Sequence, residues 1–383
     1  MSYHVYVSAR HNLTSIAKQH CFTNKNARGP AHKESECLAM TTLLEDEILS
    51  QPEVIARLLE RELANIDAII TQLPPFEYVV IAARGSSDHA AMYATYAWAA
   101  LAGVPVSLAT PSLYTLYAAP PRLNGALVVG ISQSGQSPDI RAVLTEAKRQ
   151  GRPTIAITND GTSPLALEAD HVVQLHAGQE RSVAATKTYT AQLTIIAAFA
   201  AAWNHDQQRR RELQALPDAI AATLAATAPI AAYAERYRYM NGCAVLGRGY
   251  NISTAFELAL KLKELTYVLA NPYSSADFRH GPIATITEGS PALLIAPSGK
   301  TLPDMLELAQ QLRERHAELI IVSDDQGALD LATTPLALVT TVPEWLSPVT
   351  AIIPGQLLAL RLALAKGHFP DVPRGLNKVT KTL

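Results

Sequence analysis

The segment with the clearest chemical meaning is a turn rich in hydroxyl and amide side chains. The apolar run 127–131 predicts a buried parallel strand, and Pro138 opens an amphipathic helix that continues to about Arg149. The residues between these elements include Ser132, Gln133, Ser134 and Ser137. Backbone N–H groups and the positive end of the helix dipole point into such a turn, which suits it to a monophosphate. The spacing fits neither a Walker loop nor a dinucleotide fingerprint, and a plain connection is the alternative.

A second group of residues could move protons. Glu257, Lys261 and Glu264 are spaced i, i+4, i+7, which places them on one face of a helix. Their neighbours are mostly leucine and phenylalanine, so the helix is expected to be largely buried, and buried charges need partners or a task. An exposed, ion-paired helix face is the alternative. His280 precedes Gly-Pro in a loop, where a histidine can exchange protons near neutral pH or be idle.

Alternating strands and helices are expected to position these groups. Strands are predicted at 78–83, 104–109, 127–131, 154–157 and 172–175, and helices at 89–102, 138–149 and 184–203. This alternation predicts a three-layer α/β sandwich with a parallel sheet, whose ligands lie at the carboxyl ends of the strands. Ser86 and Ser87 follow the first strand as the serine turn follows the third. Two hydroxyl-rich turns are therefore expected to face one crevice.

The second half of the sequence repeats landmarks of the first, with strands predicted at 244–246, 293–296 and 319–322. Gly249 follows Gly85 by 164 residues, Gly299 follows Gly135 by 164, and Asp325 follows Asp160 by 165. Three landmarks at nearly one offset predict an internal duplication, which gives two tandem three-layer αβα sandwiches with parallel sheets. The second copy has lost most of the hydroxyl groups, so its turn is not expected to bind phosphate.

The pattern suggests six segments. We expect a disordered extension or a start codon placed too early, a helical segment, a first domain with the phosphate site, a linker with one helix, a second domain, and a tail over the active site. Their predicted bounds are 1–39, 40–75, 76–203, 204–238, 239–366 and 367–383.

Composition narrows the class of protein. A formal net charge of −2 gives no electrostatic case for nucleic acid or an anionic membrane as partner. Three scattered cysteines form neither a zinc spacing nor a disulfide framework, as expected in a reducing compartment. The run 193–203 is taken as the longest mostly apolar stretch, too short to span a bilayer. We therefore expect a cytoplasmic protein that needs no metal and no cofactor.

Several motifs together resemble one family. They are Arg84-Gly-Ser-Ser-Asp88, Ser132-Gln-Ser-Gly135, Val183-Ala-Ala-Thr-Lys187, Glu257-Leu-Ala-Leu-Lys-Leu-Lys-Glu264, His280-Gly-Pro282 and Leu376-Asn-Lys-Val-Thr380. The chain from about residue 40 onward is similar to the double sugar-isomerase-domain proteins, meaning the isomerase half of glucosamine-6-phosphate synthase and its glutaminase-free relatives.

The resemblance implies roles for individual residues. Glu264 would be the base that moves a proton between C1 and C2 of an open-chain sugar, with Lys261 beside it. His280 would assist ring opening from the other subunit of a homodimer with a shared active site, and Lys378 would handle the carbonyl or hydroxyl end. The residues expected to bind the phosphate or touch the sugar are Ser86, Ser87, Ser132, Gln133, Ser134, Ser137, Val183 and Ala184.

The chain also departs from the synthase pattern. Residues 1–39 are not expected to build a glutaminase domain, and Cys21 is not expected to be a nucleophile, so glutamine is not the expected ammonia donor. Ser112-Leu-Tyr114 lacks an acidic residue that the synthase group carries there, and Asn271 and Asp277 stand where relatives often have Glu. The compact C-terminal sequence 378–383 resembles that of the deaminases in the same family.

We therefore expect an enzyme that converts glucosamine 6-phosphate and water to fructose 6-phosphate and ammonia. The alternatives on the same scaffold are a galactosamine-6-phosphate deaminase, a fructosamine-phosphate deglycase and a ketose–aldose phosphosugar isomerase. A non-catalytic sugar-phosphate sensor is an alternative of a different class.

Overall fold

The computed structural model describes residues 42–378 of the 383-residue chain. The expected extension over residues 1–39 and the end of the expected tail, 379–383, lie outside the described residues. The described part begins with two helices, α2 (Leu43–Leu49) and α3 (Gln51–Gln72). The Thr42 hydroxyl caps α2 by accepting a hydrogen bond from Glu45 N at 3.1 Å, and a proline in the first turn of α3 suits the start of that helix.

The first half contains a parallel sheet of five strands in the order β2-β1-β3-β4-β5. Its strands are β1 (Tyr78–Ala82), β2 (Val106–Leu108), β3 (Ala126–Ile131), β4 (Thr154–Thr158) and β5 (His171–Gln174). Its helices are α4 (Ser86–Ala102), α5 (Ser112–Thr115), α6 (Pro138–Arg149), α7 (Pro164–Glu168) and α8 (Lys187–Trp203). All five predicted strands are present, which confirms a parallel α/β arrangement.

The second half repeats this arrangement. Its strands are β6 (Gly242–Gly247), β7 (Leu269–Ser274), β8 (Pro291–Ile295), β9 (Glu318–Ser323) and β10 (Thr334–Ala337). Its helices are η1 (Gly249–Asn251), α12 (Ile252–Thr266), α13 (Ser275–Arg279), η2 (Pro282–Thr285), α14 (Leu302–Glu314), α15 (Gln326–Leu331), η3 (Glu344–Leu346) and α16 (Ser347–Ala365). The order β7-β6-β8-β9-β10 matches that of the first sheet, and α14 begins 164 residues after α6. The predicted duplication is confirmed.

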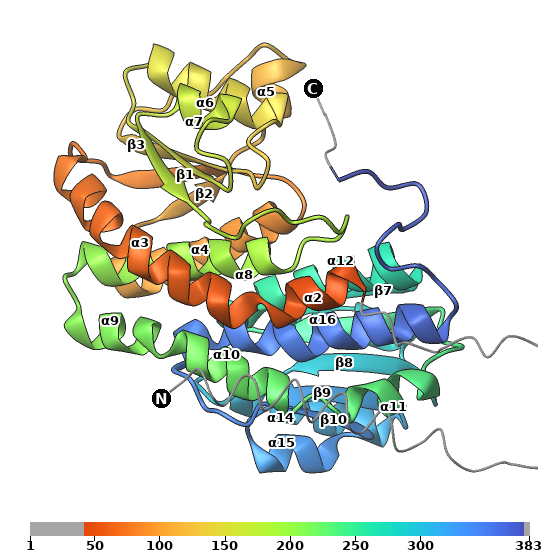
Figure 1. Ribbon diagram of the computed structural model, residues 1–383. Coiled ribbons are helices and arrows are strands. Elements are labelled where there is room, and N and C mark those ends of the chain that lie inside the picture. Colours follow the sequence, from red (N-terminus) through yellow and green to blue (C-terminus); the bar gives the residue numbers. More distant parts are fainter. Residues whose placement is uncertain (1–41, 379–383) are drawn as a thin grey trace, which may run out of the picture. The chain divides into compact units, whose positions relative to one another are not determined.

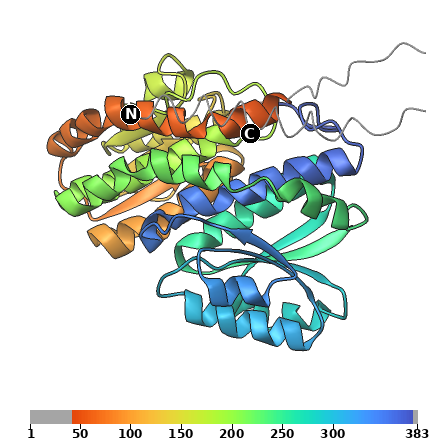
Figure 2. The same ribbon diagram turned by 60° about the horizontal axis from the view of Figure 1, so that its bottom comes forward.

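Helices fill the space between the two sheets. Figure 1 shows α3, α4, α8, α12 and α16 between the sheets, with α6 and α7 on the outer face of the first sheet and α14 and α15 on that of the second; Figure 2 shows the second sheet from another side. Side chains alternate accordingly: Val79 and Ile81 of β1 enter the large central core, whereas Val80 and Ala82 enter a smaller core under α6. The central core contains side chains from both halves.

The structure differs from the expected elements at several points. The segment expected as a linker and one helix forms three helices, α9 (Gln207–Gln214), α10 (Leu216–Ala225) and α11 (Ile230–Arg236). Strands β7 and β10 were not expected. Helix α4 begins at Ser86 rather than at residue 89, because Gly85 (φ 55°) turns the chain directly into the helix. Helix α8 begins at residue 187, which leaves Val183 and Ala184 in the preceding loop.

The run 193–203 is not the longest apolar segment, so that expectation was wrong. Residues 344–365 are long and apolar enough to cross a bilayer, with a mean hydropathy of 1.5. However, 89% of the apolar window is buried inside the fold, where α16 packs against α10, α11 and α12. This burial is typical of a core helix.

Candidate active site

A crevice is expected where the connections leave the first sheet in opposite directions. The chain passes from β1 to the edge strand β2 and then returns to β3 on the other side of β1. In parallel sheets of this kind, ligands bind outside the carboxyl ends of the strands at such a switch point. Neighbouring strands lie roughly 5 Å apart, so the turns after β1 and β3 are brought side by side. These turns carry Ser86 and residues 132–137.

The turn after β1 is fixed by an ion pair to its neighbour. Arg84 Nε lies 2.8 Å from Oδ2 of Asp139, a buried carboxylate in the first turn of α6. The Ser87 hydroxyl is buried and accepts a hydrogen bond from Gln192 Nε2 of α8 at 3.0 Å. The Ser86 hydroxyl points to the second half of the molecule, where it donates to Glu257 Oε1 at 2.9 Å. The two serines therefore face different surroundings.

The turn after β3 is tightly built, and its serine hydroxyl groups keep their own protons to donate. Gly135 has a φ of 62°, and a Cβ atom there would lie 2.1 Å from Ser163 Oγ, so only glycine fits. The Ser132 hydroxyl accepts from Gly135 N at 3.2 Å and the Ser134 hydroxyl from Gln136 N at 3.3 Å. Ser137 is the N-cap of α6, yet its side chain makes no capping hydrogen bond. This geometry suits an anion placed at the start of α6.

A buried group of charges lies opposite Ser86 on α12. Lys261 is 1% exposed, and its Nζ lies 3.3 Å from Glu257 Oε1 and 2.6 Å from Glu264 Oε2. Glu257 is fully buried, whereas the Glu264 side chain is 22% exposed. The predicted helix face is therefore real, but it is buried, so an exposed ion-paired face is excluded. Glu264 is the member of the group that solvent can reach.

The electrostatics favour the charged forms of both buried partners. Burial alone would raise the pKa of Glu257, but Lys261, His89 and the Ser86 hydroxyl outweigh it and hold that pKa below its usual range. Burial alone would lower the pKa of Lys261, and the carboxylates of Glu257 and Glu264 outweigh it and raise that pKa. Lys261 thus remains a cation fixed between two carboxylates.

The loop between β5 and α8 meets the C-terminal segment. Lys378 Nζ forms an ion pair with Glu180 Oε2 at 2.8 Å. Glu180 is buried and also accepts hydrogen bonds from Thr186 N, at 3.0 Å, and from Thr188. The same loop carries Val183 and Ala184. Lys378 is therefore brought to the loop that follows β5, at the carboxyl edge of the first sheet.

His280 lies apart from the other predicted residues. It is exposed at the end of α13, and its backbone N–H donates to Asp277 O at 3.1 Å. Within residues 42–378, no hydrogen bond or ion pair joins its side chain to Lys261, Glu264 or the serine turns. A role in the site of the same chain has no support from these contacts.

Sequence reasoning did not assign roles to several residues of the site. His89 of α4 lies with Nδ1 2.7 Å from Glu257 Oε2, Arg84 braces the two turns, and Glu180 holds Lys378. Glu257 itself was recognised as part of the charged helix face but not as a site residue. His89 and Glu180 contact residues far away in the sequence, so no local spacing reveals them.

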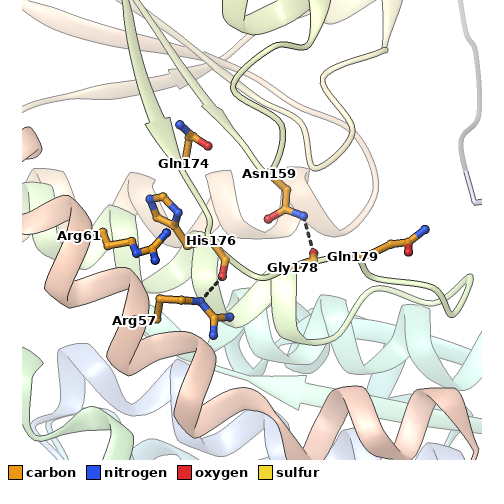
Figure 3. A pocket seen from close by; sticks show the side chains of 7 residues that line it. All are labelled: Arg57, Arg61, Asn159, Gln174, His176, Gly178 and Gln179. Carbon is orange, nitrogen blue, oxygen red and sulfur yellow. Dashed lines mark hydrogen bonds between the residues drawn. The ribbon is translucent and has the colours of Figure 1, made fainter.

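A separate hollow lies between α3 and the end of β5 (Figure 3). It has a volume of about 520 Å³ and is lined by Arg57, Arg61, Asn159, Gln174, His176, Gly178 and Gln179. Arg57 Nε donates to His176 O at 2.8 Å, and His176 Nε2 lies 2.6 Å from Glu62 Oε1. None of the predicted site residues lines this hollow.

The fold and the site define a duplicated α/β protein whose two halves meet where Ser86 of α4 contacts Glu257 and Lys261 of α12. The SIS domain model matches this chain twice, over residues 77–202 and 241–366. The chain therefore belongs to the SIS domain family, which confirms the resemblance.

The chain is similar to isomerizing aminotransferases in both sequence and fold. The chain is 34% identical over 352 residues to a glutamine–fructose-6-phosphate aminotransferase (isomerizing) from Zymomonas mobilis, with 88% of this chain and 58% of the relative covered. It thus spans somewhat more than half the length of that relative. The C-terminal domain of the glucosamine-fructose-6-phosphate aminotransferase from Francisella tularensis matches with 29% identity and a TM-score of 0.78, covering 90% of this chain and all of that chain. A glucosamine-6-phosphate deaminase from Thermotoga maritima shares the fold, with 20% identity and a TM-score of 0.72, covering 89% of this chain and all of that chain.

Proposed function

We propose that the protein is an isomerase-type enzyme of amino-sugar phosphates, which converts glucosamine 6-phosphate and water to fructose 6-phosphate and ammonia. The observation that carries the proposal is the buried Glu257–Lys261–Glu264 group, which lies against Ser86 beside a turn suited to phosphate. Similarity to aminotransferases that act on fructose 6-phosphate supports the same class of substrate.

In this proposal the first half binds the substrate. The phosphate lies at the start of α6, where the hydroxyl groups of Ser132, Ser134 and Ser137 and the backbone N–H groups surround it. Gln133 lies in the same turn. Val183 and Ala184 contact the sugar from the loop before α8, and Lys378 approaches its carbonyl end.

The second half supplies the proton transfer. In the open-chain aldehyde, Glu264 removes the proton from C2 and returns it to C1, by way of an enolamine. One proton also passes from the amino nitrogen to O1, so that a ketimine with a hydroxyl group at C1 results. Water then adds to the C2=N bond and ammonia leaves, so that the ketone of fructose 6-phosphate remains. Lys261 stays protonated, and its charge stabilises the oxygen at C1 as negative charge develops there.

Ring opening requires a further acid–base group, and we propose that His280 supplies it from a second subunit of a homodimer. The exposure of His280, and the lack within residues 42–378 of a hydrogen bond or ion pair from its side chain to the other site residues, support this assignment. Its test is a mixture of two inactive variants, His280→Ala and Glu264→Gln, because mixed dimers would regain one complete site. Absence of any regained activity, with mixed dimers verified, would contradict a shared site.

The decisive experiment measures ammonia and fructose 6-phosphate released from glucosamine 6-phosphate, with galactosamine 6-phosphate in parallel. Turnover of the gluco epimer supports the proposal, and turnover of the galacto epimer alone keeps the chemistry and changes the substrate. Release of neither product from either sugar would overturn the deaminase assignment. Fructose 6-phosphate binding by calorimetry would then separate a sugar-phosphate sensor from other chemistry.

A further inference from the structure

The hydrogen-bond partners of Glu257 single out one residue of the first half. Oε1 of Glu257 receives the Ser86 hydroxyl at 2.9 Å and lies 3.3 Å from Lys261 Nζ. Oε2 lies 2.7 Å from Nδ1 of His89, the one hydrogen-bond partner that residues 42–378 supply to this oxygen. An ionised carboxylate only accepts hydrogen bonds, so Nδ1 of His89 carries the proton that is donated.

The position of His89 is fixed by its surroundings. Its side chain is only 14% exposed, and its ring meets the Phe256 ring edge to face at 5.9 Å between centroids. Helix α4 brings it from the first repeat, whereas Glu257 and Phe256 belong to α12 of the second. The contact therefore joins the two halves at the proposed site.

We propose that His89 is a positioning residue, which holds Glu257 and, through Glu257 and Lys261, orients Glu264 for proton transfer. The chain of contacts is continuous, because Lys261 Nζ lies between Glu257 Oε1 and Glu264 Oε2. Lys261 also donates to Ser86 Oγ at 3.3 Å, so a movement of its ammonium group shifts its distance to both carboxylates.

Loss of the His89 hydrogen bond changes how Lys261 is shared. Oε2 of Glu257 would then lack a donor in a buried position, and Lys261 is the cation close enough to satisfy it. Lys261 would move toward Glu257 and away from Glu264. The carboxylate of Glu264 would lose its orientation. Within residues 42–378, no hydrogen bond or ion pair joins His89 to the turn after β3, so that turn would be unaffected.

This inference rests on the proposed function, and three variants test it. His89→Leu removes the donor and keeps the branching at Cγ, whereas His89→Asn keeps an N–H donor attached to Cγ. Tyr96→Phe, on an exposed position of the same helix, is the matched control. We expect His89→Leu to lower kcat about 10- to 100-fold with KM changed less than about threefold, and His89→Asn to recover much of the loss. A merely structural role would not separate Leu from Asn in kcat at equal thermal stability.

The outcomes distinguish the inference from the proposed function. If the wild-type protein releases neither product, the proposed function fails. If the wild type is active and His89→Leu retains kcat within about twofold, or Asn is no better than Leu, the positioning role is overturned. The ¹⁵N spectrum of histidine-labelled protein gives a check that needs no substrate. A protonated Nδ1 of His89 in the wild type, with a resonance that shifts in Glu257→Gln, supports the contact. An unprotonated Nδ1 in the wild type overturns it.

Discussion

The two halves share one backbone plan and carry different chemistry. Residues 164 apart occupy corresponding places, so α12 corresponds to α4. Glu257, Lys261 and Glu264 of α12 have as counterparts Tyr93, Ala97 and Ala100 of α4. The first half has the serine-rich turn and lacks the charged helix face. The second half has the charged helix face and lacks the serine-rich turn. In the proposed mechanism, duplication has divided substrate binding and proton transfer between two copies of one fold.

The turns after β3 and β8 show the same division. In the second half, Glu344 Oε2 accepts from Lys300 N at 2.9 Å, and Oε1 accepts from Thr301 N at 3.1 Å and from the Thr301 hydroxyl at 3.0 Å. A carboxylate of the protein itself thus occupies the start of α14. In the first half, the corresponding backbone N–H is that of Gln136, and it donates to a neutral group, the Ser134 hydroxyl. The backbone N–H groups of the second turn therefore meet a carboxylate, whereas the Gln136 N–H of the first turn meets a neutral hydroxyl group.

The largest effect is expected from the charged helix face. Glu264→Gln removes the proposed base and should lower kcat about 10³- to 10⁴-fold, while fructose 6-phosphate still binds through the first half. Product release and calorimetry measure the two properties separately. Ala100→Ser, at the counterpart position in α4, is the matched control and should keep full activity. Unchanged turnover in Glu264→Gln would refute the assignment of the base.

The next effect concerns stability and its pH dependence. Glu257→Gln should lower the free energy of unfolding by about 3 kcal/mol near neutral pH, because it removes one partner of a buried ion pair. The pKa of Glu257 is lower in the folded than in the unfolded state. Its contribution to the free energy of unfolding is therefore complete above the unfolded-state pKa of about 4.3, and is lost as the pH falls through the folded-state pKa. The difference between wild type and variant should therefore shrink on acidification.

Tyr93→Phe provides the comparison in the first half. Tyr93 is buried and donates a hydrogen bond to Trp345 O at 2.6 Å, so its loss should cost about 1–2 kcal/mol. Because no group titrates in that hydrogen bond, the cost should be constant between pH 4 and pH 8, within roughly 0.5 kcal/mol. Denaturant unfolding at several pH values measures both variants. Parallel pH profiles would contradict the electrostatic difference between the halves.

A smaller effect is expected where the second turn holds its own carboxylate. Glu344→Ala removes three hydrogen bonds to a charged acceptor and should lower stability by about 2 kcal/mol, measured by thermal or denaturant unfolding. Ser137→Ala, at the counterpart of Thr301, should cost less than about 0.5 kcal/mol because its side chain makes no capping hydrogen bond. Equal losses in the two variants would show that the turns are equivalent.

The smallest effect separates substrate binding in the two turns. Ser134→Ala should raise KM about tenfold, because one donor to the phosphate is lost, with kcat little changed. Ser298→Ala is the counterpart in the second turn and should leave both constants unchanged. Steady-state kinetics test the pair. A raised KM in the Ser298 variant would indicate that the second turn binds the substrate phosphate, which contradicts its assignment to the first half.

The sequence allowed the buried strands of both sheets to be predicted, because β3 and β8 are continuous apolar runs. Strands β7 and β10 were missed, since each lies at a sheet edge and contains a proline, Pro272 or Pro335, which weakens the strand signal. The charged face of α12 could be predicted from spacing alone. The contact of His89 with Glu257 could not, because it spans 168 residues and depends on how the two halves pack.

The shared central core also bears on how the molecule arose. Nearly every side chain of α8 and α16 is buried, and these counterpart helices contact each other between the two sheets. One half alone would expose an apolar helix on all the sides that the other half now covers. An ancestral chain with a single repeat would have needed a second copy to cover that surface. Two copies joined in one chain associate at any protein concentration, and each copy is then free to lose what the other retains.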